Sequence, residues 1–97
     1  MKDFVLTPRA ELDLIEIWEY IAQDNVDAAD RVLDELEKMM YKLAAMPGMG
    51  HVREDLVDRR HRCWPVYSYL IIYRLDTAPL QIIRVISGCR DIPGLFS

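Results

Sequence analysis

Arginine is the residue type in this chain whose chemistry is easiest to place. Residues 49–97 contain seven Arg and no Lys. A planar guanidinium group donates two parallel hydrogen bonds to a phosphate or a carboxylate, which the ammonium group of Lys cannot do. Arg62, Arg74, Arg84 and Arg90 lie within or beside apolar runs. We therefore predict that these four arginines mark a functional surface.

The densest basic run, Arg59-Arg60-His61-Arg62, has two interpretations. Glu54, Asp55 and Asp58 precede it, and a charged run beside acids is usually a solvated face. The alternative is a surface that contacts phosphate, in which His61 would act as a base, although nothing in the sequence positions it.

Arg74 and Arg84 are more informative because each interrupts an apolar run. Whether they share a face depends on strand register: a four-residue loop places them on opposite faces and a three-residue loop places them together. The sequence leaves this open. A buried Arg without a partner is costly, so each needs a carboxylate, a bound anion or an open rim.

Other site chemistries have little support. Cys63 and Cys89 are far apart, and because we expect no export signal in this chain, we expect both to be reduced. His51 and His61 have no carboxylate or thiol at metal-ligand spacing, so we predict no metal site and no cofactor.

Charge and hydropathy limit the class of partner. The net charge is −4, and residues 1–48 carry five Lys/Arg against eleven Asp/Glu. This acidity argues against broad non-specific binding to nucleic acid, which depends on neutralising many phosphates, but does not exclude a local Arg-lined surface. We expect no direct sequence-specific nucleic-acid binding by this chain alone. No apolar run approaches the about 20 residues needed to span a bilayer. We expect a single cytoplasmic domain over residues 1–97 that does not contact the membrane.

The elements that position the arginines begin with a hairpin. Two runs rich in Ile, Val, Tyr and Leu, Tyr67–Leu75 and Leu80–Ser87, flank a short polar break. They are more apolar than a half-exposed sheet requires, so at least one face must be covered. Further strands are predicted over Lys2–Leu6 and around Arg60–Val66, with Pro65 restricting the latter to an edge or a bulge.

Two helices are predicted to cover that sheet, over Pro8–Gln23 and about Ala28–Ala45. Thr7 and Asp27 are their expected N-caps, and the short break between the helices requires an antiparallel hairpin. The expected buried positions follow helical spacing. They are Ala10, Leu14, Ile17, Trp18 and Ile21 in the first helix, and Ala29, Val32, Leu36, Met39, Met40 and Leu43 in the second. We expect Trp18 to be a core residue rather than an exposed partner contact.

The chain ends in Ile92-Pro93-Gly94-Leu95-Phe96-Ser97, which Pro-Gly prevents from forming a regular helix. Leu95 and Phe96 are expected either to pack on the sheet or to be buried in a partner, and the sequence does not favour one of these.

In this order of elements the chain resembles the ParE branch of the ParE/RelE toxin superfamily, from bacterial type II toxin–antitoxin systems. The resemblance covers nearly the whole chain and depends on the order and spacing of several short motifs. These are Leu6-Thr7-Pro8-Arg9-Ala10 with Asp13-Leu14, Ile17-Trp18 and Tyr20-Ile21; Ala28-Ala29 with Arg31; Met46-Pro47-Gly48-Met49-Gly50 with Arg53 and Leu56; Trp64-Pro65-Val66; Tyr69-Leu70-Ile71-Ile72-Tyr73-Arg74; and Ile83-Arg84-Val85 with Gly88, Arg90 and Asp91.

The resemblance implies an α+β fold, a small, mostly antiparallel sheet in the order β-α-α-β-β-β with the N-terminal helix hairpin packed on one face. It also implies a ParD-like antitoxin that folds on binding and covers apolar surface. The candidate aromatic side chains for contact with that antitoxin are Trp18, Trp64, Tyr67 and Tyr69.

Two activities occur on this fold. The RelE branch cleaves mRNA in the ribosome, which needs cationic groups at the scissile phosphate and a group that moves a proton. Arg90 matches an Arg of that branch, but the Tyr six residues beyond it is replaced by Phe96, and residues 43–97 contain no Lys. The ParE branch poisons DNA gyrase through a protein–protein surface.

We therefore predict a gyrase-directed toxin without catalytic residues, neutralised by its antitoxin. The alternatives are a ribosome-dependent endoribonuclease that uses Arg90, Arg62 and His61, and a non-toxic interaction module.

Overall fold

The computed structural model describes residues 3–50 and 60–87. Strand β1 is followed by two α-helices, a 3-10 turn and three further strands, which confirms the predicted α+β order. The elements are β1 (Phe4–Leu6), α1 (Pro8–Ala22), α2 (Val26–Ala45), η1 (Pro47–Met49), β2 (His61–Val66), β3 (Tyr69–Arg74) and β4 (Leu80–Ser87). The predictions about His51, Cys89, Arg90, Leu95 and Phe96 fall outside the described residues.

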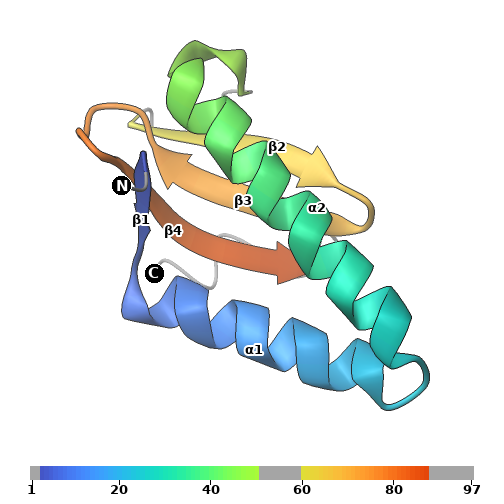
Figure 1. Cartoon of the computed structure of the whole chain (residues 1–97). Helices are drawn as coiled ribbons and strands as arrows, with labels where there is room; N and C mark the ends of the chain where they lie inside the picture. The colour runs from blue at the N-terminus through green and yellow to red at the C-terminus, as the bar shows by residue number, and fades with distance from the viewer. Residues whose placement is uncertain (1–2, 51–59, 88–97) are drawn as a thin grey trace.

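The four strands form one mixed sheet in the order β1-β4-β3-β2 (Figure 1). β1 runs parallel to β4, whereas β4, β3 and β2 are antiparallel to their neighbours. Pro65 therefore lies on an edge strand, where its missing N–H costs no ladder hydrogen bond, as predicted.

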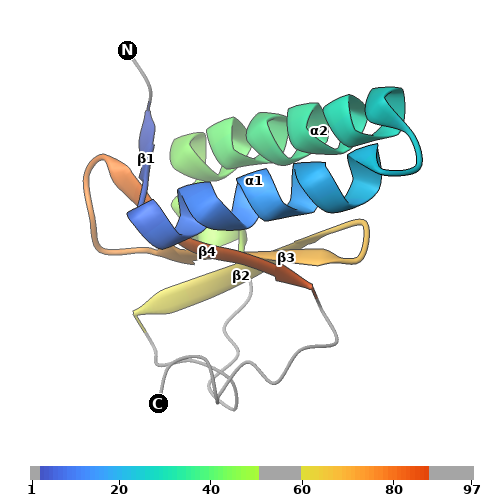
Figure 2. The same cartoon turned by 90° about the horizontal axis from the view of Figure 1, so that it is seen from below.

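Both helices lie on the same side of the sheet (Figure 2). The core between the two layers is apolar and uses the helical and strand positions that the sequence pattern indicates. Its most deeply buried side chains include Phe4, Leu36, Met40, Leu43, Ile71, Tyr73 and Ile82. A second cluster, without helical members, contains Cys63, Leu70, Ile72, Ile83 and Ile86. Cys63 is buried in that cluster.

The N-caps agree with the prediction in one helix only. Thr7 Oγ1 accepts a hydrogen bond from the Ala10 N–H at 3.1 Å and so begins α1. The cap of α2 is Asn25 rather than Asp27. Asn25 has extended backbone geometry, and its Oδ1 accepts from the Ala28 N–H at 3.0 Å. Asp27 instead lies in the first turn, near the positive end of the helix dipole.

The expectation that Trp18 is a core residue is wrong. Its side chain is 37% exposed, and its indole Nε1–H donates to Asp30 Oδ1 at 2.8 Å. Ile17 and Ala10 fill the core face of α1. Trp18 follows Ile17 by one residue and is rotated about 100° away from it.

Tyr73 connects β3 to the turn after α2. Its hydroxyl donates to the Pro47 carbonyl and accepts from the Gly50 N–H at 3.0 Å. The side chain is fully buried, and burial raises the pKa of its phenol above the ordinary 10.0. The Pro-Gly segment is thereby held against the sheet.

Candidate functional site

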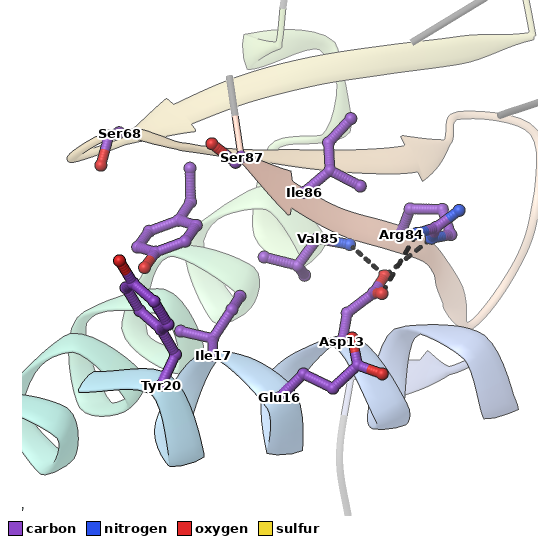
Figure 3. A pocket seen from close by; sticks show the side chains of 10 residues that line it. Asp13, Glu16, Ile17, Tyr20, Ser68, Arg84, Val85, Ile86 and Ser87 are labelled. Carbon is purple, nitrogen blue, oxygen red and sulfur yellow. Dashed lines mark hydrogen bonds and ion pairs between the residues drawn. The ribbon is translucent and has the colours of Figure 1, made fainter. Parts of the chain in front are cut away.

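A groove of about 530 Å³ lies between α1 and the last residues of β4 (Figure 3). α1 contributes one wall and β4 the other, and the turn between β2 and β3 lies at one end. The lining residues are Asp13, Glu16, Ile17, Tyr20, Ser68, Tyr69, Arg84, Val85, Ile86 and Ser87.

The groove exists because β1 is too short to cover β4. β1 pairs only with Leu80–Ile82, after which the chain turns at Thr7 into α1. Thr7 holds this junction, since its N–H donates to the Ile82 carbonyl at 3.1 Å and its hydroxyl donates to the Ile83 carbonyl at 2.8 Å. Beyond Ile83, α1 rather than a strand lies beside β4.

A buried ion pair closes one part of the groove. Arg84 donates from Nε to Asp13 Oδ2 at 2.7 Å and from Nη2 to Asp13 Oδ1 at 3.2 Å. The same carboxylate accepts from the Val85 N–H at 3.1 Å. Asp13 is 4% exposed and Arg84 is 9% exposed. Asp13 thus neutralises Arg84 and also occupies a main-chain donor at the uncovered edge of β4.

A register shift decides the relation between Arg74 and Arg84. Ile72 pairs with Arg84, but the next residue, Tyr73, pairs with Ile82, so Ile83 is an extra residue in β4. Arg74 follows Ile72 by two, and Arg84 pairs with Ile72. The two arginines therefore share a face. The bulge at Ile83 therefore decides that Arg74 and Arg84 share a face, a question that the length of the loop between the strands left open.

Of the four predicted arginines, the structure describes Arg62, Arg74 and Arg84, and two of these contact carboxylates. Arg74 forms two hydrogen bonds with Asp76, at 3.1 and 3.0 Å, and this contact lowers the pKa of the Asp76 carboxyl. Arg84 is buried against Asp13. Arg62 is half-buried in β2, and its backbone lies opposite Tyr73 in the register of β2 with β3. A role for these residues and for Arg90 at a functional surface remains a prediction.

The four predicted aromatic contacts lie in different places. Tyr69 lines the groove, and Tyr67 is 68% exposed at the adjoining turn, with a φ of 54° that is unusual for a residue other than Gly. Trp64 is half-buried against the core, and Trp18 lies on the surface of α1 beside Asp30.

Tyr20 is the aromatic residue that the sequence analysis missed. It is 73% exposed and lines the groove together with Tyr69. Burial raises the pKa of the Tyr69 phenol, and the negative charge that Tyr20 would carry raises it further. The sequence could have indicated Tyr20 as a neighbour of Asp13, because Asp13, Glu16 and Tyr20 are spaced by three and four residues and must share one helix face.

Two further site types are not found within residues 3–50 and 60–87. No group of three His, Cys, Asp or Glu side chains there could hold a metal ion. None of the helices in this part of the chain has the length and hydropathy to cross a membrane.

Comparison with known proteins identifies relatives over most of the chain. Residues 4–92 match the family model described as the ParE toxin of the type II toxin–antitoxin system parDE. Toxin ParE1 of Caulobacter vibrioides is 36% identical over 87 residues, which is 89% of this chain and 88% of that toxin. Toxin ParE3 of the same organism is 29% identical over 77 residues, which is 78% of this chain and 76% of that toxin.

A solved structure shares the fold. A chain of the chromosomal ParDE toxin–antitoxin system from P. aeruginosa superposes with a TM-score of 0.73 at 19% identity. The match covers 90% of this chain and 96% of that one. At this identity, the match supports the architecture of the sheet and helix hairpin.

Proposed function

Because this chain belongs to the ParE toxin family of type II toxin–antitoxin systems, we propose that it inhibits DNA gyrase by docking and that a ParD-like antitoxin neutralises it. In this proposal the protein acts through a binding surface and without a catalytic residue. The match of residues 4–92 to the ParE toxin family supports the proposed target and antitoxin, and the ion pair of Arg84 with Asp13 supports a role for Arg84 other than catalysis.

Phosphate chemistry requires cations that are free to face the scissile group. The charge of Arg84 is neutralised by buried Asp13, and Arg74 makes a bidentate contact with Asp76. The hydroxyl of Tyr73 is bonded to the turn after α2. Burial raises the pKa of Tyr69, which makes its phenol a weaker source of phenolate at neutral pH. These contacts favour docking over cleavage of RNA by Arg74, Arg84 or either tyrosine. The endoribonuclease alternative uses Arg62, His61 and Arg90 instead, and the expression experiment tests it.

The groove is the surface that we propose for the antitoxin. Its apolar lining residues are Ile17, Val85 and Ile86. The rings of Tyr20 and Tyr69 also line it, and Ser68 and Ser87 supply hydroxyl groups. Tyrosine rings with one polar end commonly carry much of the binding energy at protein interfaces. An antitoxin segment seated here would bury both rings.

Expression of the chain in bacteria tests the gyrase proposal. We expect filamentation and an accumulation of gyrase–DNA cleavage complexes, and purified protein should inhibit supercoiling by gyrase. Unchanged supercoiling together with codon-phased cuts in mRNA would contradict the proposal and support the endoribonuclease alternative. Harmless expression without antitoxin would favour the non-toxic module.

The groove proposal has a separate test. Replacing Tyr20 and Tyr69 by Ala should weaken antitoxin binding at least tenfold, measured by calorimetry. Val26→Ala, at the 52% exposed first residue of α2, is the control and should bind normally. Equal affinity of the groove variant and the control would place the antitoxin elsewhere.

A further inference from the structure

The outer surface of α1 carries a row of exposed apolar side chains. Leu12 is 42% exposed, Ile15 is 53% exposed and Trp18 is 37% exposed, and we call these three residues the outer strip. Their spacing of three places them within an arc of about 120° on the helix. Asp13 and Tyr20, which face the groove, lie on another side of α1. The outer strip is therefore a separate surface.

Trp18 is held in place at the end of this strip. Its indole N–H donates to Asp30 of α2, so the ring is fixed at the surface rather than turning freely. A fixed aromatic ring loses little conformational entropy when a partner covers it. Among exposed apolar side chains, such a ring is the usual energetic centre of an interface.

The charges that α1 itself carries along the outer strip have one sign. Glu11 and Glu19 are exposed and lie within the same arc of the helix as Leu12, Ile15 and Trp18. The one cation in α1 is Arg9, which contacts Asp13 at 3.4 Å and Glu16 at 4.0 Å on the groove side. A partner that covers the strip must place positive charge beside these glutamates.

We propose that the outer strip docks a basic amphipathic helix of a protein partner. A row of side chains on a helix accepts another helix by packing ridges into grooves. The main-chain groups of α1 are bonded within the helix, so strand addition has no donors or acceptors there. Leu12 to Trp18 extends about 9 Å along the axis, which matches roughly two turns of a partner helix.

The negative charges of Glu11 and Glu19 beside the outer strip disfavour two other occupants. A second copy of the chain would bring Glu11 and Glu19 against the same residues, and like charges repel. An anionic membrane surface attracts helices rich in Lys and Arg, which this face lacks. The proposal does not depend on gyrase inhibition or on occupancy of the groove.

Trp18 fluorescence provides the test. In a Trp64→Phe variant Trp18 is the sole tryptophan, since the chain has two. The probe is a helical peptide of about 18 residues built from Leu and Lys, a length at which isolated helices become stable. We expect saturable binding with a blue shift of Trp18 emission. A peptide with Glu in place of Lys should not bind.

Matched variants assign the contact to the strip. Ile15→Ser should weaken binding at least tenfold, whereas Val5→Ser, at a 45% exposed position of β1, should not. The double reversal Glu11→Lys/Glu19→Lys should also abolish binding, and Asp3→Lys, at an exposed position before β1, should leave it intact.

Several results would overturn the proposal. These are equal binding of both peptides, unchanged binding by Ile15→Ser, a concentration-dependent shift without peptide, and a shift with phosphatidylglycerol vesicles. If Trp64→Phe does not fold, hydrogen exchange of the unaltered chain replaces fluorescence. The peptide should then protect residues 11–19, and protection confined to residues 84–87 would contradict the outer strip.

Discussion

At the scale of single residues, Asp13 is the side chain that joins α1 to β4. Its carboxylate accepts from the Arg84 guanidinium and from the Val85 N–H, and it lies 3.4 Å from Arg9. Arg84 needed a carboxylate, an anion or an open rim, and the fold supplies a carboxylate 71 residues away in the sequence. One side chain thereby fixes α1 against β4.

Removing Asp13 should leave a buried, uncompensated guanidinium. We expect Asp13→Ala to lower the free energy of unfolding by about 3–5 kcal/mol, measured by urea denaturation. Glu16→Ala, one turn away on the same helix face but exposed, should change stability by less than about 0.5 kcal/mol.

The double variant Asp13→Leu/Arg84→Met separates charge from packing. Because both charges leave together, it should recover much of the stability that Asp13→Ala loses. A double variant as unstable as Asp13→Ala would show that the burial of unpaired charge is not the cause.

At the scale of elements, the junction of η1 and β3 is tight. A Cβ added to Gly50 would overlap the Tyr73 hydroxyl and would lie 2.9 Å from ring atoms Cε1 and Cζ. Gly48 in the same turn has no atom within 4 Å of an added Cβ. The two glycines therefore differ in what they tolerate, although the sequence pattern treats them alike.

We expect Gly50→Ala to reduce stability by about 1–3 kcal/mol, because the ring must shift in a packed core. Thermal denaturation with Gly48→Ala as the matched control measures this difference. Combining Gly50→Ala with Tyr73→Phe should cost less than the sum of the two changes, since the hydroxyl is the nearest obstacle. Strict additivity would contradict the proposed contact.

At the scale of the whole molecule, α1 is the element that connects three surfaces. Its inner side packs on the sheet through Ala10 and Ile17, a second side lines the groove through Asp13 and Tyr20, and a third carries the outer strip. Global stability then depends on the core beneath α1 and β3.

Alkaline pH should test the two phenols whose pKa burial raises, Tyr73 in that core and the partly buried Tyr69 at the groove. Burial raises the pKa of Tyr69 and Tyr73 above 10.0, so the folded state holds these protons more tightly than the unfolded chain. Their contribution is fully present below about pH 10 and is lost as pH rises through the raised values. The urea midpoint should therefore fall more steeply above pH 10 than below it.

Tyr73→Phe should be less stable at neutral pH, because it loses the bonds to Pro47 and Gly50, but should depend less on pH above 10. Tyr67→Phe, at a largely exposed ring, is the control and should follow the unaltered chain. Identical alkaline slopes for all three proteins would contradict a role for the buried phenol.

The local pattern of apolar and polar residues was sufficient to predict the helices and the strands of the hairpin. Apolar spacing in Pro8–Ala22 and Val26–Ala45, and the β-rich runs on either side of Asp76–Pro79, predicted the helices and the hairpin to within a few residues. Thr7 was identified as a cap for the same reason, because capping involves only neighbouring residues. The α+β class follows from these local properties.

The site depended on contacts between distant segments. The ion pair of Asp13 with Arg84 arises where α1 meets β4, and the environment of Trp18 is set where α1 meets α2. The bulge at Ile83 arises where β4 pairs with β3. The sequence by itself determined which residues are apolar, charged or helix-forming, since those are properties of each residue and its neighbours. Only the tertiary structure decided which charges neutralise one another and which apolar side chains remain uncovered, because burial is set by what the rest of the fold places beside them.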